Sequence, residues 1–259
     1  MIFPHAKKGE LKKMTEINAG IKMDFGELND KIRESTDREI SIKGCTGQRY
    51  IASGLSGKKI EIDGIPGNAL GSYLDGSSIT VRGNVQDATG DTMNCGEIVI
   101  HGNAGDATGY AMRGGSIYIK GNTGYRAGIH MKAYKEQQPA LIIGGEAGSF
   151  LGEYQAGGII AVLDIEQKAE RRGNGTFIAT GMHGGKIYMR LRTGAKVPEV
   201  PPYVKLTLGH GKDLAEIRPY LEKFCSYFGD VNLDSLIESD YAVLEPNKDH
   251  PYKQTYCLN

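Results

Sequence analysis

Residues 79–124 read ITVRGNVQDATGDTMNCGEIVIHGNAGDATGYAMRGGSIYIKGNTG, and the spacing of apolar residues and glycines within them predicts the architecture. It holds two β-branched residues separated by one position, Ile79 and Val81, with Gly83 two positions further on. The same arrangement returns about every 19 residues. Apolar residues alternating with a period of two predict a short strand with one buried face. One such strand cannot bury its face alone, so the copies are expected to stack on each other.

The apolar pair recurs through the middle of the chain, with a degenerate last copy around residues 179–190. The regular pairs are Ile40/Ile42, Ile60/Ile62, Ile79/Val81, Ile98/Ile100, Ile117/Ile119, Leu141/Ile143 and Ile160/Val162. The expected fold class is all-β: a right-handed parallel β-helix, a single-stranded solenoid of about seven to eight turns of ~19 residues. Short helical flanks are expected at both ends, with helices near Glu27–Glu34 and Pro219–Phe228. The expected divisions are an N-terminal flank or cap at 1–38, the β-helix at 39–196 and a C-terminal extension with one helix at 197–259.

A glycine triplet of the form G-x2-G-x3-G accompanies the strands. Its members are Gly64, Gly67 and Gly71; Gly83 and Gly90, which flank Gln86 in the central place; Gly102, Gly105 and Gly109; Gly121, Gly124 and Gly128; and Gly145, Gly148 and Gly152. Glycine adopts backbone geometry that a Cβ resists, so these residues are predicted to be structural turn glycines. Valine at Gly102 or Gly121 is expected to unfold or aggregate the protein, on the view that these positions need a positive φ.

Asparagine falls at one phase in three successive repeats, at Asn84, Asn103 and Asn122. Stacked amides at this phase would form an internal hydrogen-bonded ladder that fixes the register of the repeats. Two other interpretations are that these residues bind a ligand or are ordinary turn residues after glycine.

Composition excludes several classes of function. With 31 basic and 31 acidic residues the formal net charge is zero, which disfavours nucleic acid as a partner. No apolar stretch is long enough for a membrane span, and Met1–Lys13 lacks the apolar core of a secretory signal. The four cysteines are scattered without a C-x-x-C pair, which argues against a metal site and fits reduced thiols in the cytoplasm. They are Cys45, Cys95, Cys225 and Cys257.

No catalytic motif stands out. The chain has neither a G-x-S-x-G elbow nor a GxxxxGK[ST] loop, and a dinucleotide fingerprint would occur once and open a helix. Asp87 and Asp106 share a phase, as the carboxylates of a sugar-cleaving enzyme would, but Tyr125 replaces them one repeat later. We therefore expect no catalytic, cofactor-binding or metal-ligating residue in this chain.

A recognition surface is the alternative to chemistry. Arginine and tyrosine are enriched at binding hot spots, and Arg49, Arg113 and Arg126 each lie near a tyrosine. A plain salt-bridged surface is the other interpretation. His130 and His183 both follow glycine-rich corners, where they are expected to bond corner carbonyls or meet a partner rather than act as a proton-handling pair. These five residues form the predicted partner interface.

Seven segments, in order, resemble the C-terminal glycine-repeat (GXGXG) β-helix domain of the glutamate synthase large subunit, in the split form where that domain is a separate polypeptide. They are GQRYIASGL (47–55), IPGNALGSYLDG (65–76), QDATGDTMNCG (86–96), GDATGYAMRGG (105–115), GYRAGIHMK (124–132), GGEAGSFLGEYQAGG (144–158) and TGMHGG (180–185). The resemblance implies a non-catalytic subunit that holds a glutaminase-type amidotransferase and an FMN and iron–sulfur synthase together, with both cofactors on the partner. Homo-oligomerisation is left open.

Two alternatives remain beside that interpretation. Formylmethanofuran dehydrogenase has a subunit with the same glycine-repeat domain, and a stand-alone scaffold or regulatory protein is the other alternative. The segments GQRYIASGL, TGYAMRGG and GYRAGIHMK resemble the glutamate synthase domain more closely than the formylmethanofuran dehydrogenase subunit.

Overall fold

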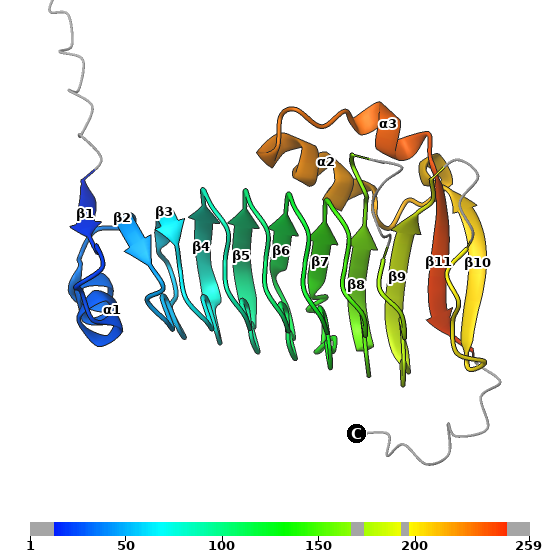
Figure 1. Ribbon diagram of the computed structural model, residues 1–259, viewed down its shortest axis with the longest axis horizontal. Coiled ribbons are helices and arrows are strands. Elements are labelled where there is room, and N and C mark those ends of the chain that lie inside the picture. The colour runs from blue at the N-terminus through cyan, green and yellow to red at the C-terminus, as the bar shows by residue number, and fades with distance from the viewer. Residues whose placement is uncertain (1–12, 167–173, 193–196, 248–259) are drawn as a thin grey trace, which may run out of the picture.

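The computed structural model describes residues 13–166, 174–192 and 197–247, and its strands form one 11-stranded sheet. Strands β1 to β9 lie in chain order and pair in parallel, and β11 and β10 continue the sheet antiparallel beyond β9 (Figure 1). The strands are β1 (Met14–Asn18), β2 (Glu39–Thr46), β3 (Lys59–Ile65), β4 (Asp75–Val81), β5 (Cys95–Ile100), β6 (Ser116–Ile119), β7 (Ala140–Ile143), β8 (Ala156–Val162), β9 (Gly184–Arg190), β10 (Val204–His210) and β11 (Asp240–Pro246). The helices are α1 (Phe25–Glu34), the 3-10 turn η1 (Gly211–Asp213), α2 (Arg218–Tyr227) and α3 (Leu233–Ile237).

The repeated apolar pairs set the register of the parallel strands. Ile60 lies between Ile40 and Ile79, and the same alignment continues through Ile98 and Ile117. These side chains are at most 1% exposed, and with apolar residues of the loops they fill a core that runs the length of the sheet. The predicted strands and their register are therefore confirmed, because burying one face of every strand leaves a single alignment open.

The expected fold class, a right-handed parallel β-helix with helical flanks, is wrong. Each repeat contributes one strand to a single mostly parallel sheet, and the rest of the repeat returns through tight turns. Between those turns the described residues form isolated bridges instead of strands: parallel ones from Ala104 to Thr123 and from Thr123 to Ala147, and an antiparallel one from Tyr134 to Gln137. A turn of a β-helix and a single strand followed by a long returning loop both give a period of about 19 residues. The period therefore could not distinguish the two architectures.

The two ends of the sheet also differ from the expected flanks. At the N-terminal end the unexpected strand β1 pairs with β2, and α1 buries Leu28 and Ile32 in the same core. At the other end β11 pairs antiparallel with β9, and β10 pairs with β11. Residues 197–247 thus add two strands to the sheet, which the sequence had not predicted, in addition to the helices α2 and α3.

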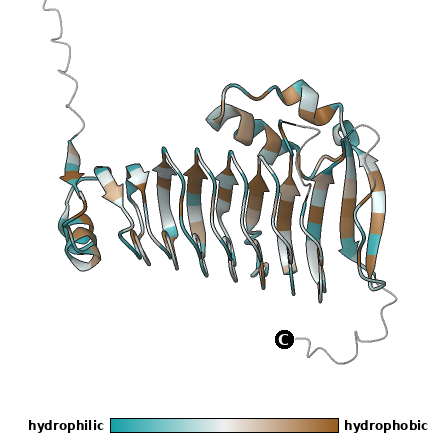
Figure 2. Cartoon of the chain, viewed as in Figure 1, coloured by the Kyte–Doolittle hydropathy of each residue, from teal (hydrophilic) through white to brown (hydrophobic). Residues whose placement is uncertain are grey.

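A second core lies on the outer face of the sheet, where α2 and α3 cover the strands from β5 onward (Figure 1). Phe224 of α2 is fully buried there against Phe228, with ring centroids 4.7 Å apart. The outward-facing strand residues change along the chain from Glu61 and Thr80 to the apolar Val99 and Ile142. Figure 2 shows this as strongly hydrophobic strands beneath the helices. That change was visible in the sequence and would have predicted a covering layer.

Two rows of residues run along the loops in the left-handed backbone conformation. They fall two residues after the second and the third position of the glycine triplet, and φ lies between 52° and 65° in the repeats from residue 69 to 154. The first row is Ala69, Ala88, Ala107, Arg126 and Phe150, and the second is Tyr73, Thr92, Ala111, His130 and Tyr154. Each residue donates its backbone N–H to a carbonyl of the next repeat, as Thr92 does to Tyr110 at 2.7 Å and His130 to Glu153 at 2.9 Å. This hydrogen bond offsets the strain of a side chain at positive φ.

Thr92 is the most strained member of the rows, because a β-branched residue is rarely left-handed. Asparagine tolerates this conformation without the extra unfolded-state entropy of glycine. We expect Thr92→Asn to raise the free energy of unfolding by about 0.5–1 kcal/mol, measured as a higher urea midpoint at an unchanged slope. Thr80→Asn, within β4, should lower the midpoint, because asparagine disfavours strands. A Thr92→Asn protein less stable than wild type would contradict the assigned strain.

Candidate partner interface

The glycine triplets allow neighbouring repeats to lie close together. The physical requirement for glycine at the first two positions differs from that at the third. The third glycines, such as Gly109 and Gly128, have φ of 73° and 69°. Apart from Gly64, with φ of 120°, the glycines at the first two positions are not at positive φ. A Cβ at Gly102 would nevertheless meet Asn84 Oδ1 at 2.3 Å, and a Cβ at Gly124 would meet Asp106 Oδ1 at 2.0 Å. The expectation that Gly102 and Gly121 need a positive φ is therefore wrong: close approach of neighbouring repeats requires them.

The asparagine ladder exists in a form other than the expected internal amide stack. Asn84 Oδ1 accepts the backbone N–H of Asn103, and Asn103 Oδ1 accepts that of Asn122, both at 2.8 Å. Asn122 Oδ1 then accepts the N–H of Glu146 at 2.8 Å. Asn84 and Asn103 are not buried. The amides therefore join consecutive repeats near the surface by bonding to backbone rather than to one another.

Aspartates form a second ladder beside that of the asparagines. The asparagines directly follow the first triplet position, and the aspartates directly follow the second. Asp87 Oδ1 accepts the N–H of Asp106 at 2.9 Å, and Asp106 Oδ1 accepts the N–H of Tyr125 at 2.8 Å. Where Gln86 replaces the central glycine, the matching contact from Asp87 N–H to Asn68 Oδ1 lengthens to 3.3 Å. These carboxylates thus fix the stacking of the repeats, which accounts for the phase they share.

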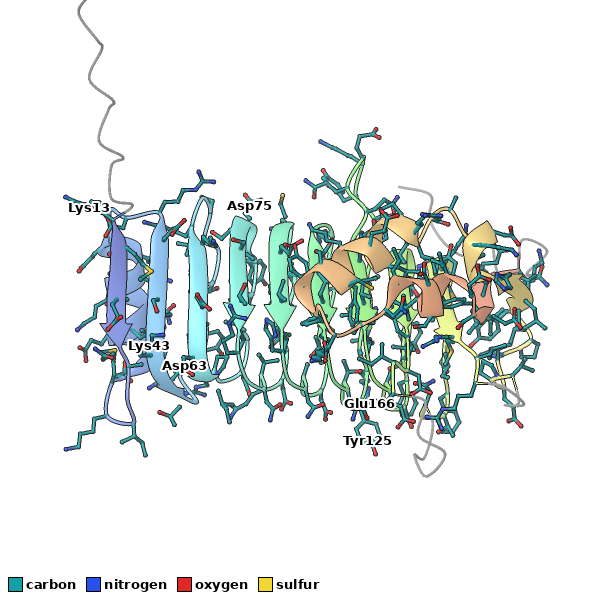
Figure 3. All side chains as sticks on the ribbon, turned by 90° about the horizontal axis from the view of Figure 1, so that it is seen from above. Lys13, Lys43, Asp63, Asp75, Tyr125 and Glu166 are labelled. Atoms are coloured by element: carbon teal, nitrogen blue, oxygen red, sulfur yellow. The ribbon has the colours of Figure 1, made fainter. Side chains whose placement is uncertain are left out.

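Exposed rings gather along the loop edge of the last repeats, and we call this surface the aromatic edge. It comprises the exposed Tyr110, Tyr125, Arg126, His130, Tyr154 and Phe177 and the half-buried Phe150. The His130 ring stacks on Tyr154, with centroids 5.1 Å apart and planes within 9°, and it meets Tyr110 edge-on at 5.9 Å. Phe150 stacks on Phe177 at 5.1 Å. Figure 3 shows Tyr125 pointing outward from this side of the sheet.

Positive charge accompanies the rings. The Arg126 guanidinium lies 5.0 Å from the centre of the Phe150 ring, and its Nε is 3.4 Å from Glu153 Oε2. Arg113 and Lys132 are exposed and follow Tyr110 and His130 closely in the sequence. In the last repeat His183 takes the place that Arg113 and Lys132 have in theirs, and its Nδ1 lies 3.1 Å from the carbonyl oxygen of Gly181. Rings that are already stacked lose little side-chain freedom on binding, so this surface suits a protein partner.

The structure brings four of the five predicted interface residues to this surface: Arg126 and His130 within the aromatic edge, Arg113 and His183 beside it. Arg49 lies apart at the first repeat, where its guanidinium is 5.2 Å from the ring centre of Phe25 in α1. The sequence pattern had not pointed to Phe150, Tyr154 and Phe177. Each falls two residues after a triplet position, or after the glycine that corresponds to one, and that spacing could have identified them.

Metal-binding and membrane-spanning features are not found within residues 13–166, 174–192 and 197–247. No group of three or more His, Cys, Asp or Glu side chains in these ranges could hold a metal ion. None of the helices there is long and apolar enough to cross a membrane. Cys45 is buried, which raises the pKa of its thiol to about 11, whereas Cys95 is exposed. Cys257 lies outside the described residues.

The geometry of stacked glycine triplets defines a class of repeat domain, and the chain matches the model of that class. The GXGXG motif family covers residues 15–245, so the chain belongs to this family. The uncharacterized protein MJ1350 of Methanocaldococcus jannaschii is 44% identical over 259 residues, covering 95% of this chain and 98% of that protein.

A solved structure shows the same fold. It is a chain from the formyltransferase/hydrolase complex (FhcABCD) of Methylorubrum extorquens in complex with methylofuran. The two chains superpose with a TM-score of 0.58 at 22% identity, over 77% of this chain and 70% of the other. This likeness establishes a shared architecture.

Proposed function

We propose that the chain is a structural subunit of a multi-subunit enzyme complex and binds a catalytic subunit through the aromatic edge. The observation that carries the proposal is the continuous row of ring contacts from Tyr110 through His130 to Tyr154, which remains exposed although the core beneath the loops is fully covered. Exposed aromatic clusters on folded proteins mark surfaces that other proteins cover. The partner, rather than this chain, supplies the reacting groups.

A counterpart of the glycine-repeat subunit of formylmethanofuran dehydrogenase is the candidate that the comparisons support best. The superposed chain belongs to a complex whose stated activity is formyl transfer and hydrolysis, with methylofuran bound. A chain with the same architecture and an exposed aromatic edge would occupy a comparable place between catalytic subunits. The partners would then carry the machinery of formyl transfer.

A glutamate-synthase-like complex is the second candidate, and specific segments favour it. GQRYIASGL, TGYAMRGG and GYRAGIHMK resemble the glycine-repeat domain of that enzyme, and the last two contribute Tyr110, Arg113, Arg126 and His130 to the interface. Here the partners would be a glutaminase-type amidotransferase and a synthase that carries FMN and iron–sulfur clusters. A packed array of repeats would hold such partners at a fixed separation, which a flexible linker would not.

Affinity purification of the tagged chain from its own cells at low salt, with peptide identification and an absorbance spectrum, tests both candidates. A pterin-bearing partner or formyl-transfer subunits would establish the first, and flavin and iron–sulfur absorbance with a glutaminase the second. Recovery of the chain alone at every salt concentration would refute the proposed role.

Tyr154→Ala connects the purification to the aromatic edge. Because the His130 stack is then removed, we expect partner recovery to fall at least about tenfold, as for a hot-spot residue. Tyr73→Ala is the matched control, since Tyr73 holds the same triplet phase, is 55% exposed against 45% for Tyr154, and lies outside the aromatic edge. Equal losses in both variants, or none in Tyr154→Ala, would exclude this surface as the interface.

A further inference from the structure

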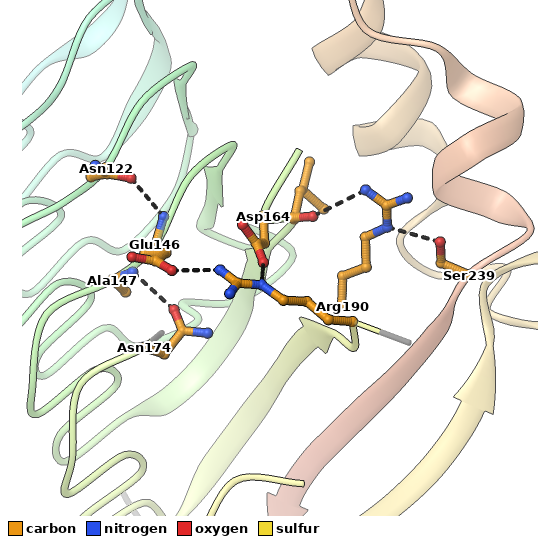
Figure 4. Close-up of polar contacts among 9 residues, drawn as sticks. Asn122, Glu146, Ala147, Asp164, Asn174, Arg190 and Ser239 are labelled. Carbon is orange, nitrogen blue, oxygen red and sulfur yellow. Dashed lines mark hydrogen bonds and ion pairs between the residues drawn. The ribbon is translucent and has the colours of Figure 1, made fainter. Parts of the chain in front are cut away.

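The outer edge of β10 is an open end of the sheet. β11 lies between β9 and β10, and among the described residues β10 pairs with β11 alone. The strand is held firmly in place: seven of its residues pair with β11, and Arg190 of β9 ties down the residues before β11. Its Nε donates to Ser239 Oγ at 2.8 Å, and its Nη2 donates to the carbonyl of Ser235 at 2.7 Å (Figure 4). An edge that is already ordered loses little conformational entropy on binding.

Backbone hydrogen bonds at both ends of β10 show which of its groups face β11. Asn247 N–H donates to the carbonyl of Tyr203 at 2.9 Å, and Gly211 N–H donates to that of Ser239 at 2.8 Å. Successive residues of an antiparallel strand point their backbone groups to opposite sides, so the odd-numbered residues of β10 face β11. The even-numbered ones point outward: Val204, Leu206, Leu208 and His210.

Three of these outward residues have an N–H without a partner among the described residues. Val204 is the exception, because its N–H donates to the carbonyl of Pro201 at 2.9 Å. Unpaired N–H and C=O groups along a terminal strand form a template for a further strand. The edge of β10 is therefore a site for backbone pairing, with free donors on Leu206, Leu208 and His210.

The features that protect edge strands are missing from β10. Natural proteins protect such edges with prolines, bulges and charged side chains. β10 contains no proline, and its register with β11 has no shift. Lys205 Nζ lies 3.3 Å from Glu245 Oε1 on β11, so its charge is held beside the neighbouring strand. Leu206 packs partly buried against the core of the inner face, while Leu208, on the same face, is 66% exposed. Apolar surface thus accompanies the free backbone groups.

We propose that two copies of the chain pair through β10, antiparallel about a two-fold axis at Thr207, and so continue one sheet across a dimer. This inference goes beyond the proposed function and does not depend on it. In this register Leu206 lies opposite Leu208 of the other copy, so the exposed leucine is covered by an apolar residue. A two-fold interface uses the same surface of both subunits, and β10 is complementary to itself in the way that such an interface requires.

The same register satisfies the backbone and the charges. Outward residues lie opposite outward residues, so each free N–H of β10 meets a free carbonyl of the other copy. His210 lies opposite Val204, whose N–H already has a partner and whose carbonyl accepts from His210 N–H. Lys205 lies opposite Gly209, so no like charges are opposed. All seven residues of the strand take part.

The opposite end of the sheet does not suit this pairing. β1 has only five residues, and its central residue, Glu16, is exposed. Antiparallel pairing of the whole strand with its own copy would place two Glu16 carboxylates side by side, and like charges that lie opposite each other destabilise a strand pair. Self-association therefore favours β10 over β1.

Sedimentation equilibrium of the full chain over a range of concentrations tests the dimer. We expect twice the mass of the single chain at high concentration and dissociation on dilution. Leu208→Lys should keep the melting temperature, because the side chain is exposed in the single chain, and should raise the dissociation constant at least about tenfold. Met14→Lys, at a 54% exposed position of β1, is the matched control and should leave it unchanged. A wild-type chain that stays monomeric up to about 1 mM, or equal dissociation constants in the two variants, would overturn the proposal.

Amide exchange of the wild-type chain, resolved to single residues, tests the register without a substitution. The amides of Leu206, Leu208 and His210 should exchange at least about tenfold more slowly at concentrations where the dimer forms than after dilution. Thr207 and Gly209 face β11 in either state, so their exchange should not depend on concentration. Concentration-independent exchange of the three outward amides would contradict pairing through this edge.

Other occupants of the edge give different results. If residues 248–259 of the same chain covered β10, a chain ending at Asn247 would dimerise while the full chain would not. If a strand of another protein added to β10, the full chain alone would be monomeric and Leu208→Lys would lower partner recovery. Either result would overturn the dimer. We expect the full and shortened chains to dimerise equally, and Leu208→Lys to leave partner recovery through the aromatic edge unchanged, so a failure of one proposal is distinguishable from a failure of the other.

Discussion

Gly121→Val is expected to yield no soluble folded protein. A Cβ at this position would lie 2.2 Å from Asn103 Oδ1 and 2.8 Å from the backbone oxygen of Gly102. Both atoms serve the stacking of the repeats: the first accepts from Asn122 N–H at 2.8 Å, and the second accepts from Gly121 N–H at 3.0 Å. Moving them apart breaks both hydrogen bonds in the middle of the array. We expect a loss above about 4 kcal/mol, which is a large part of the stability of an ordinary domain.

The measurement is the soluble fraction after expression, followed by circular dichroism and urea unfolding of whatever remains. Gly57→Ala separates the two explanations for glycine, because Gly57 has φ of 69° but nothing within 4 Å of a Cβ. Left-handed strain alone should cost Gly57→Ala only about 1–2 kcal/mol. Gly121 is not at positive φ, but a Cβ there has no space. Gly121→Ala should therefore lower the free energy of unfolding by more than Gly57→Ala does. The reverse order, or a native-like Gly121→Val protein, would contradict the close-approach argument.

Phe224→Ala is expected to detach α2 from the sheet. Phe224 is fully buried, and its ring lies so close to the loop after β7 that a Cβ on Gly144 would be 2.7 Å from Cζ. Removing a buried phenylalanine side chain costs about 3–5 kcal/mol. The second core, which includes Tyr118 and Ile142, would then be exposed, while the first core on the inner face stays intact.

Hydrogen exchange resolved along the chain, together with binding of a hydrophobic dye, distinguishes this local effect from global unfolding. Amides of α2, α3 and β11 should lose protection first, and those of β2 to β4 should keep it. Ser226→Ala, at an exposed position of the same helix, should leave both measurements unchanged. Uniform loss of protection across the sheet would show that the two cores unfold as one unit.

The local parts of this fold could be predicted from the sequence because they depend on short-range periodicity. Apolar pairs from Ile40 to Ile160 identified the strands and their register, since only one alignment buries every strand on the same face. The helices α1 and α2 begin within two residues of the expected positions. Of the candidate interface, Arg113, Arg126, His130 and His183 were predicted from residue type and spacing, and the structure brings them to one surface.

Other features depend on which segments meet in space. The period of 19 residues does not say whether a repeat returns through further strands or through turns, so the β-helix was the wrong inference from a correct repeat. The need for glycine at Gly102 and Gly121 was wrongly attributed to backbone conformation, because a distance between repeats leaves no trace in a local pattern. The stacking of Tyr154 on His130 also joins residues 24 positions apart in different repeats.

A glycine-triplet repeat with one buried strand face in each copy could be identified from the amino-acid sequence alone. Three features became visible only in the folded chain: all strands belong to a single sheet, β11 and β10 extend it antiparallel beyond β9, and α2 folds back over the outer face of the sheet. The folded chain also shows that the outer edge of β10 is unpaired among the residues described. Side-chain periodicity acts over a few residues, whereas the order of strands, their covering by helices and the burial of single side chains depend on contacts between segments far apart in the sequence, as between Glu97 and Tyr227, 130 residues apart.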